Sequence, residues 1–541
     1  MATTRRPTAL SERLVPDELW LLARPLIPRF QPRPQGGGTA PLPDRAVLTA
    51  IVYVLTSGCA WRDLPSWLGV PFQTAHRRFT QWTDAGMWHR LHQAAARDGG
   101  QAFAGWTRAI LNGAGSRAPA AGEHAPHRRQ EKTVARSDMD VIVVGAGPVG
   151  LTLASELRAG GVSVLVLDRE PVPRQPHKAG SMGARALNAP TVTALRDRGL
   201  LPAVKAAALF WFDPAEQAGS AVHPPPFSGH FAGIPVRTDL ADPGLAADHP
   251  GAGVIAQQDL ESILADRAVE LGACVRRGVR ATGFRDDGDA VTVQTADGEF
   301  RASWLVGCDG GHSLVRTIGG FGFPGYASAY VGYQAIVDLD SPEKLATSWA
   351  TTEFGSYVVG GWQQDGPPRV HVIEYGAQAY RDGPVTLERL QQALRRVSGL
   401  DVTITRVHVA TSYTDTTRLA STYRRGRVAL AGDAAHVHSP AGGQGLNLGI
   451  GDAVHLGTAL TQVVHGADPD LLDRYTAERR RVGAWVQKWT MAQTALGRPD
   501  PRTQALRDVF SELLDTPDGA TYVLARIAGI RSDRRPAGDK P

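Results

Sequence analysis

The sequence is poor in cysteine and has no long apolar run. Three cysteines occur among its 541 residues, at Cys59, Cys274 and Cys308. Their odd number and wide spacing exclude a disulfide framework and a cysteine-based zinc site, and we expect no metal and a reducing cytoplasm. No apolar run reaches the roughly 18 residues that a membrane helix needs, and the first residues lack the apolar core of a signal peptide. We therefore expect neither membrane insertion nor secretion.

Aromatic residues make up only 7% and charged residues 21% of the chain, while 43% of the residues are hydrophobic. These shares are ordinary for a folded protein and exclude a chain that is disordered throughout. The length exceeds what one core organises, so we expect two to four folding units. Charge is divided unevenly. Residues 1–137 hold 18 Lys and Arg against 9 Asp and Glu, a net +9, and the remaining residues hold 40 against 44, a net −4. This difference indicates two parts of different character.

Residues 14–95 have the pattern of a helical domain. Apolar residues fall at helical spacing in 19–23 and 47–55, and a stretch rich in Pro and Gly over 32–43 separates the two. The segment 72–82 is basic on one side and aromatic on the other. It fits a DNA-facing helix of the helix-turn-helix type, and equally a solvated basic face over an aromatic core.

The segment from Glu18 to Leu91 resembles the N-terminal domain of insertion-element transposases of the IS5 kind, and the similarity continues to Asn112. In that family the position of Asn112 holds the first of three metal-binding carboxylates. An amide does not hold Mg²⁺ as a carboxylate does, and no nuclease domain follows, so transposase chemistry is not expected. The resemblance leaves weak DNA binding by residues 1–112 as the one nucleic-acid contact to consider.

Residues 113–138 show no apolar period and are predicted to be a linker. Met139 follows directly. Our hypothesis is that a complete gene product begins at Met139 and that the preceding residues are a fused fragment of a mobile element. Mass spectrometry of the protein from its native host tests this, since a mature N-terminus found only at Met139 would mean that the fragment is not made.

A nucleotide-binding unit is predicted after the linker. A short β-type run over 140–144 leads into a glycine loop, a helical pattern over 151–157 and a second apolar strand that ends at Asp168. In such a unit the glycines allow a tight turn close to a pyrophosphate, the helix N-terminus binds its charge, and the acid binds ribose hydroxyls. The residues predicted to bind the dinucleotide here are Gly145, Gly147, Pro148, Val149, Gly150, Asp168 and Arg169. The alternative is an α/β turn that binds nothing. A second Gly-x-Gly-x-x-Gly match, over 320–325, lacks this context and is interpreted as a turn.

Two further motifs favour FAD over NAD. Residues 304–316 contain a strand, an Asp-Gly turn and a helix start, and residues 427–447 contain a strand ending at Gly-Asp, a glycine-rich turn and the start of a long helix. Together with the glycine loop they resemble the three fingerprints of the FAD-dependent aromatic hydroxylases, the p-hydroxybenzoate hydroxylase group, over essentially all of 139–530. The similarity is greatest to the aromatic polyketide hydroxylases of actinomycete antibiotic pathways.

This resemblance implies FAD as cofactor, NADPH as co-substrate, and O₂ and an aromatic small molecule as partners. Asp433 would bond the ribityl chain of the flavin, Pro440 would pack beside its ring, and Gln257 would contact it. Asp309 and Gly310 would contact both FAD and NADPH. The other residues implied at the cofactor are Arg185, Gly432, Gly443, Gln444, Gly445, Leu446 and Asn447. The structural alternatives are a β-turn cap for Asp309 and a helix N-cap for Asp433.

The sequence departs from the family pattern at several points. Pro190 stands where the family has an Arg that is expected near the cofactor, and Arg185 is the candidate to compensate. The family's C-terminal thioredoxin-like domain has no counterpart, because the similarity fades near Ile530. No catalytic base is identified. His230 and Tyr413 are candidates, but a structural role is favoured for both.

We therefore predict an α/β protein with a Rossmann-like FAD-binding domain and an antiparallel-sheet substrate domain, preceded by a small all-α N-terminal domain. The FAD-binding parts are about 139–224, 259–324 and 421–490; the substrate sheet is about 225–258 and 325–420; C-terminal helices cover about 491–530. The predicted activity is hydroxylation of a polycyclic, polyketide-type phenol through a flavin C4a-hydroperoxide. Three alternatives remain: a flavin halogenase, whose Trp-x-Trp-x-Ile-Pro signature is missing, an NAD dehydrogenase, and an impaired fusion that binds FAD, or weakly DNA, without turnover.

Overall fold

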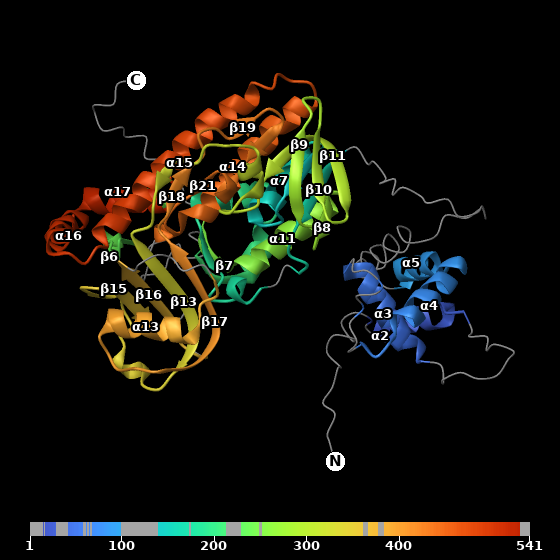
Figure 1. Cartoon of the computed structure of the whole chain (residues 1–541), viewed down its shortest axis with the longest axis horizontal. Helices are drawn as coiled ribbons and strands as arrows, with labels where there is room; N and C mark the ends of the chain where they lie inside the picture. The colour runs from blue at the N-terminus through green and yellow to red at the C-terminus, as the bar shows by residue number, and fades with distance from the viewer. Residues whose placement is uncertain are drawn as a thin grey trace, which may run out of the picture. The chain divides into compact units, whose positions relative to one another are not determined.

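The chain forms two compact units, Met1–Glu131 and Lys132–Pro541 (Figure 1). The computed structural model describes residues 15, 17–28, 42–57, 61, 64, 68–98, 139–172, 175–212, 229–247, 251–360, 366–376 and 383–530. Cys59, Asn112 and the predicted linker over 113–138 lie outside the described residues.

All the secondary structure described in the first unit is helical. Its elements are α2 (Asp17–Ala23), a 3-10 turn (Arg24–Leu26), α3 (Asp44–Ser57), α4 (Phe72–Asp84) and α5 (Met87–Asp98). Leu19, Ile51, Phe79 and Trp82 are fully buried in its core, because the apolar residues of each helix recur at helical spacing. This confirms the predicted all-α N-terminal domain.

The basic residues of α4 do not all face solvent. Arg78 is buried and pairs with Asp44 of α3, while His76 and Arg77 are exposed. The described part of this unit holds 6 Lys and Arg against 5 Asp and Glu, a net +1 out of the +9 counted over residues 1–137. Most of the net positive charge of residues 1–137 therefore belongs to residues outside the described part, whereas the basic segment 72–82 lies within it.

An eight-stranded sheet is the centre of the second unit. Its strands run in the order β19-β20-β11-β1-β2-β8, and β10 joins β9 to β11. The pairings among β20, β11, β1, β2 and β8 are parallel, whereas β19, β10 and β9 pair antiparallel. The bounds are β1 (Met139–Val144), β2 (Val164–Asp168), β8 (Cys274–Arg277), β9 (Ala281–Asp286), β10 (Val291–Thr295), β11 (Gly298–Gly307), β19 (Arg424–Arg425) and β20 (Val428–Leu430).

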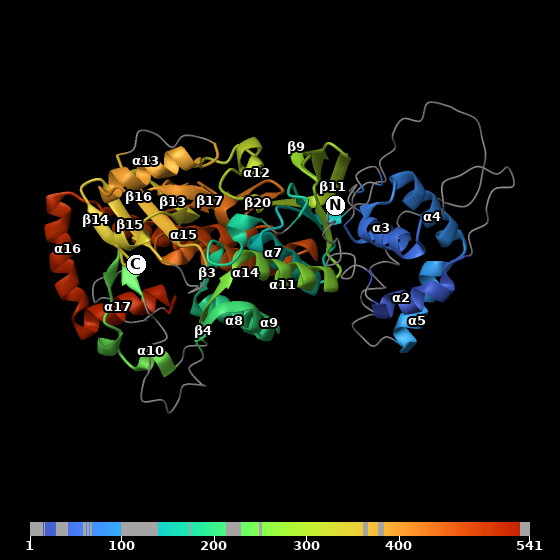
Figure 2. The same cartoon turned by 90° about the horizontal axis from the view of Figure 1, so that it is seen from below.

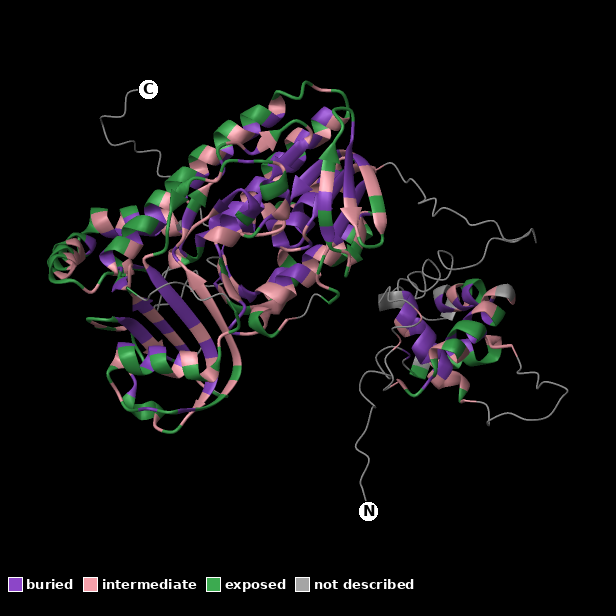
Figure 3. Cartoon of the chain, viewed as in Figure 1, coloured by how far each residue is buried: buried purple, intermediate pink, exposed green. Residues whose placement is uncertain are grey.

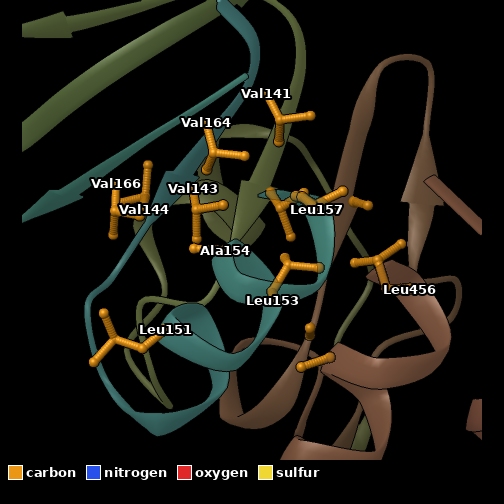
Figure 4. Close-up of a cluster of buried hydrophobic side chains, with 14 of the residues drawn as sticks. Val141, Val143, Val144, Leu151, Leu153, Ala154, Leu157, Val164, Val166 and Leu456 are labelled. Carbon is orange, nitrogen blue, oxygen red and sulfur yellow. The ribbon is translucent and has the colours of Figure 1, made fainter. Parts of the chain in front are cut away.

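Helices α7 (Pro148–Ala159), α11 (Gln257–Glu270) and α14 (Gln444–Val464) pack together beside this sheet. Figure 4 shows Leu153 and Leu157 of α7 between the valines of β1 and β2 and Leu456 of α14. The strands are buried on both faces, which is why they are continuous apolar runs rather than alternating ones. Each fully buried Val or Leu contributes about 1.5–3 kcal/mol to the stability of the fold. This core therefore holds in place the edge of the sheet at which the parallel strands end.

A second, five-stranded antiparallel sheet has the order β14-β15-β16-β13-β17. Val331, Tyr333, Ala335 and Val337 of β13 alternate toward α13 (Leu387–Ser398), which covers one face (Figure 2). The intervening residues, Gln334 among them, lie on the opposite face. The bounds are β13 (Tyr330–Leu339), β14 (Ala350–Thr352), β15 (Gly355–Val359), β16 (Arg369–Tyr375) and β17 (Ile404–Thr414).

The described residues of the segment 225–258, namely 229–247 and 251–258, do not belong to this sheet, contrary to our expectation. β5 (His230–Phe231) pairs with β6 (Ile234–Pro235), and β7 (Ala252–Ala256) pairs with β3 (Ala184–Leu187) and β4 (Ala208–Phe212). Packing explains the difference. Ile255 is buried in the core of the parallel-sheet part, and Phe231 packs against Trp489 and Phe510 of the C-terminal helices. Alternating apolar residues predict a strand but not which sheet it joins.

Seven further helices and a three-stranded sheet also belong to the described part of the second unit. The sheet has the order β12-β18-β21, with bounds β12 (Gly325–Tyr326), β18 (Thr417–Leu419) and β21 (His436–Val437). The helices are α8 (Ala189–Asp197), α9 (Leu201–Ala207), α10 (Gly244–Ala247), α12 (Leu314–Ile318), α15 (Leu471–Leu496), α16 (Pro501–Leu514) and α17 (Pro517–Ile527). Residues 320–324 form no helix, in agreement with the turn predicted for the second glycine motif. This arrangement confirms the predicted fold class.

Burial follows these layers. The central strands β1, β2 and β13 are largely buried, whereas α16 presents much of its surface to solvent (Figure 3). Among the helices of the described residues, none is both long and apolar enough to cross a membrane.

Candidate functional site

A cavity of about 980 Å³ lies where the parallel strands end and the antiparallel sheet faces them. In open α/β sheets, ligands bind outside the carboxyl ends of the strands. Val144, Leu167, Cys308 and Ala431, at or just beyond the ends of β1, β2, β11 and β20, line it from below, and the antiparallel sheet contributes Gln334, Thr411, Ser412 and Tyr413. The cavity is large enough for a ligand with several ring systems.

The glycine turn between β1 and α7 forms one wall. Gly145 has φ +109°, and a Cβ there would lie 2.3 Å from the carbonyl oxygen of Cys308. A Cβ at Gly150 would lie 2.0 Å from the carbonyl oxygen of Gly145. Gly147 caps α7 without a side-chain hydrogen bond, and Gly147, Pro148 and Val149 line the cavity. Because the first N–H groups of a helix have no intrahelical partner, this terminus favours an anion such as a pyrophosphate.

Asp168, at the end of β2, is tied to this turn. Its Oδ2 accepts a hydrogen bond from Ala146 N at 2.6 Å, and its Oδ1 accepts one from Glu170 N at 2.7 Å. Each carboxylate oxygen has a second acceptor site, so Asp168 can still accept from the hydroxyls of a ribose. Arg169 lines the cavity and pairs with Glu170.

A second helix N-terminus opens on the same cavity. Gly442 and Gly443 adopt φ +76° and +65°, and α14 begins after them without a side-chain cap. Gly443, Gly445 and Leu446 line the cavity, as does Pro440 before them. The site thus has two uncapped helix N-termini, each of which favours negative charge.

Asp433 lies in the 3-10 turn Gly432–Ala434 that follows β20. Its side chain is exposed to the cavity, and no hydrogen-bond partner for it occurs among the described residues. Arg185 of β3 lines the same cavity. Burial lowers the pKa of Arg185, and the nearby Asp433 and Glu261 partly offset this. A carboxylate without an internal partner, beside a cation, is suited to accept hydrogen bonds from a polyhydroxylated ligand.

Asp309 and Gly310 form the turn after β11, and both line the cavity. The carboxylate of Asp309 accepts hydrogen bonds from Leu314 N at 2.7 Å, Val315 N at 3.1 Å and the hydroxyl of Ser313. Asp309 therefore binds the first turn of α12, whose N-cap residue is Ser313. This role is structural, but it is not the β-turn cap named above as the alternative. Gly310, with φ +81°, gives the turn its direction.

Gln257 belongs to a polar cluster at the cavity wall. Its Nε2 donates to Glu261 Oε1 at 2.8 Å, and Lys178 Nζ lies 3.0 Å from the same oxygen. The Glu261 side chain is buried, so Lys178 balances its charge. All three line the cavity.

Four of the residues predicted to bind the cofactor do not line the cavity. Gly432 and Gly150 allow close packing: a Cβ on Gly432 would lie 2.9 Å from Val149. Gln444 donates to the carbonyl oxygen of Gly442, and Asn447 donates to those of Ala186 and Gly443. These four residues lie behind the cavity wall, which the other predicted cofactor residues form. The four are Gly150, Gly432, Gln444 and Asn447.

Tyr413 lies in the roof of the cavity, which the antiparallel sheet forms. Its hydroxyl is hydrogen-bonded to Nε2 of His371, although β13 separates their two strands. The ring crosses Gly332 of β13, where a Cβ would lie 2.1 Å from Cζ of Tyr413. Burial, reinforced by Arg369, lowers the pKa of His371 to about 3, and burial raises the pKa of Tyr413 well above its ordinary value. Both groups are therefore neutral near pH 7. His230, the other candidate base, does not line the cavity and accepts a hydrogen bond from Gly233 N.

Several cavity residues were not predicted from the sequence. Glu170, His177, Lys178, Arg280, His312 and His438 line the cavity. His312 and His438 could have been identified from their places shortly after the Asp-Gly and Gly-Asp turns, two residues after Gly310 and five after Asp433. The others carry no local signal, since the fold alone places them at the wall.

Pro190 occupies the first turn of α8, where a missing N–H costs nothing. It is absent from the cavity wall, whereas Arg185 is part of it. The residues present fit a dinucleotide of the FAD type: a glycine cradle, two uncapped helix termini, and the acceptor carboxylates of Asp168 and Asp433. No group of three or more His, Cys, Asp or Glu that could hold a metal occurs in the described residues.

Comparison with known proteins gives two family matches. The model of the FAD binding domain family matches residues 138–490, and that of the IS4/5 transposase family matches residues 15–92. The chain is 38% identical over 403 residues to a rifampicin monooxygenase of Streptomyces venezuelae, covering 72% of this chain and 78% of that protein.

Solved structures agree with the match to the FAD binding domain family. The anhydrotetracycline hydroxylase OxyS from Streptomyces rimosus superimposes with a TM-score of 0.62 and 37% identity, over 75% of this chain and 78% of that chain. PyrE3, described as a Diels-Alderase of pyrroindomycin biosynthesis, superimposes with a TM-score of 0.63 and 34% identity, over 74% of this chain and 82% of that chain.

Proposed function

Because this chain belongs to the family of FAD-binding aromatic polyketide hydroxylases and has an N-terminal region of the IS4/5 transposase family, we propose that it hydroxylates a polycyclic phenolic compound. NADPH is the proposed reductant and O₂ the oxidant. One observation supports this most: the glycine turn, Asp433 and Tyr413 line a single cavity between the two sheets. The free thiols of Cys274 and Cys308 are in keeping with the proposed cytoplasmic location.

The parallel-sheet side of the cavity is the proposed cofactor site. The N-terminus of α7 would bind the pyrophosphate of FAD, Asp168 a ribose, and Asp433 the ribityl chain. Bound FAD supplies the redox chemistry, accepting hydride from NADPH and activating O₂. The uncapped N–H groups of α14 would stabilise negative charge that develops in their part of the cavity.

The antiparallel sheet is the proposed substrate side. Gln334, Thr411, Ser412 and Tyr413 present neutral hydrogen-bonding groups to the cavity. Such a surface suits an uncharged aromatic ring system that carries hydroxyl or carbonyl oxygens. The roof and the walls would also exclude water from the reacting atoms and orient the ring.

Purified full-length protein tests the proposal. We expect a yellow preparation whose FAD absorbance remains after gel filtration. NADPH oxidation should accelerate when an aromatic polyketide intermediate is added, and mass spectrometry should detect a product that is one oxygen atom heavier. A colourless preparation that takes up no added FAD would contradict the proposal.

A second candidate function is FAD binding without turnover. Pro190 in place of the family's arginine favours it. A yellow protein whose NADPH oxidation no phenolic substrate accelerates would support this candidate. Weak DNA binding by the first unit is a separate proposal, tested by salt-sensitive binding of a DNA duplex.

A further inference from the structure

Asp452 of α14 is fully buried behind the cavity wall and makes three hydrogen bonds. Its Oδ2 accepts from Gly432 N at 3.0 Å and pairs with His436 Nε2 at 2.6 Å. Its Oδ1 accepts from Arg479 Nε of α15 at 2.7 Å. Asp452 and His436 are both 0% exposed, and Arg479 is 7% exposed. A carboxylate so far from solvent needs such partners, because burying an unpaired charge is costly.

The charges of this cluster are well defined. Burial alone raises the pKa of Asp452. The adjacent His436 and Arg479 lower this pKa by more than burial raises it, so the net shift is downward and Asp452 is ionised. Arg479 balances the carboxylate and also donates to the carbonyl oxygen of Leu448 at 3.0 Å. Nδ1 of His436 is buried without a hydrogen-bond partner.

One of the three partners is the backbone of the turn that holds Asp433. Gly432 has φ +64° and stands directly before Asp433, whose side chain faces the cavity while its neighbour Ala434 is buried. α14 also packs closely on this turn, since a Cβ at Gly449 would lie 3.3 Å from Cα of Gly432. The N–H of Gly432 is thus the point at which the charge cluster reaches the cavity wall.

We propose that Asp452 is a positioning residue for the cofactor: by holding the N–H of Gly432, it sets the direction in which Asp433 projects into the cavity. Arg479 and His436 hold Asp452 in turn, and so connect α15 to the cofactor site without touching it. This inference rests on the proposed function, because it assigns Asp433 to FAD.

The test is a double-mutant cycle on FAD affinity. FAD is removed from the full-length protein, and the apoprotein is titrated with FAD while the quenching of flavin fluorescence is followed. We expect Asp452→Asn to raise the Kd for FAD roughly 10- to 100-fold, the range for loss of a hydrogen bond to a buried charge. In the Asp433→Ala background the same change should alter the Kd by less than about 2-fold, because the group that Asp452 positions is gone.

A second variant guards against loss of folding. Asp452→Asn leaves Arg479 without a counter-charge, so Asp452→Asn combined with Arg479→Gln, which removes both charges, is measured in parallel. Thermal unfolding of each apoprotein shows how much stability is lost. Asp473→Asn is the matched control on α15, since its side chain is 61% exposed and pairs with Arg424 at the surface. It should leave the Kd unchanged.

The outcomes separate the inference from the function on which it rests. If the unaltered apoprotein does not bind FAD, the proposed function is wrong and the inference is wrong with it. If it binds FAD and the Asp452 variants bind equally well, only the inference is overturned. If the effects of the Asp452 and Asp433 changes multiply, Asp452 acts through general stability and not through the turn, which also overturns it.

Discussion

Gly332 shows how one missing side chain shapes the roof of the cavity. The ring of Tyr413 lies across the central strand β13 to reach His371 on the next strand, and only a residue without a Cβ leaves it room. The pair is neutral, so it can orient an oxygen of a substrate by hydrogen bonding but does not act as a base near neutral pH.

Replacement of Gly332 by Ala should therefore disturb the substrate side and not the cofactor side. The added methyl group would displace the Tyr413 ring, and we expect the KM for the aromatic substrate to rise roughly tenfold while the Kd for FAD changes little. Steady-state kinetics and FAD titration measure the two effects. Tyr413→Phe, which keeps the ring and removes the hydroxyl, is the companion variant and should reproduce the KM effect. An unchanged KM in both variants would contradict this role.

His371 also predicts a pH dependence of stability. Its pKa is lowered in the folded protein to about 3 from an ordinary value of 6.5. Between these values the unfolded chain binds a proton that the folded chain does not, so this group lowers the free energy of unfolding as the pH falls from 6.5 toward 3. His371→Gln should lose less stability over this range than the unaltered protein, as measured by urea unfolding at several pH values. Parallel curves for the two proteins would contradict the assignment.

At the scale of the element, α7 depends on its close approach to the glycine turn. The Cβ of an alanine at position 150 would lie 2.0 Å from the carbonyl oxygen of Gly145, so the helix or the turn would have to move. We expect Gly150→Ala to lower the free energy of unfolding by about 1–3 kcal/mol and to raise the Kd for FAD at least tenfold. Ala159→Ser, at an exposed position of the same helix, is the control and should change neither quantity. Denaturant unfolding measures the free energy of unfolding of each variant, and FAD titration measures its Kd for FAD. An unchanged value of both in Gly150→Ala would contradict this prediction.

The whole molecule consists of two units with separate hydrophobic cores. The core cluster of the first unit contains residues 15–91, and the clusters of the second unit contain no residue before position 139. A chain of residues 139–541 should therefore fold without the first unit and bind FAD with a Kd within about 2-fold of the full-length value. Far-UV circular dichroism and FAD titration check this. A shortened chain that is unfolded, or that binds FAD much more weakly, would show that the first unit supports the second.

Much of the architecture follows from the sequence, because its signals are local. The strand, glycine turn, helix and second strand of residues 139–168 have the predicted order. The helices described in the first unit lie within 17–98, so the last of them ends three residues beyond the predicted 14–95. The family assignment drawn from three ordered motifs is confirmed by the match over 138–490. The cofactor contacts of individual residues stay predictions. Gly145, Asp168, Asp309 and Asp433 line one cavity, but Gln444 and Asn447 support its wall from behind.

The sequence by itself thus determined the elements, their order and the family, since periodicity and glycine turns arise between residues close together in the chain. Three features were decided only by the tertiary structure. β7 pairs outside the substrate sheet, and Tyr413 bonds to His371 across Gly332. Asp452 accepts hydrogen bonds from both Gly432 and Arg479. These contacts join residues that are between 20 positions apart (Gly432 and Asp452) and 81 positions apart (Gly332 and Tyr413). No local sequence pattern predicts them. The physical reason is that close packing and the pairing of buried charges depend on all the elements of the core together, and not on residues that are neighbours in the chain.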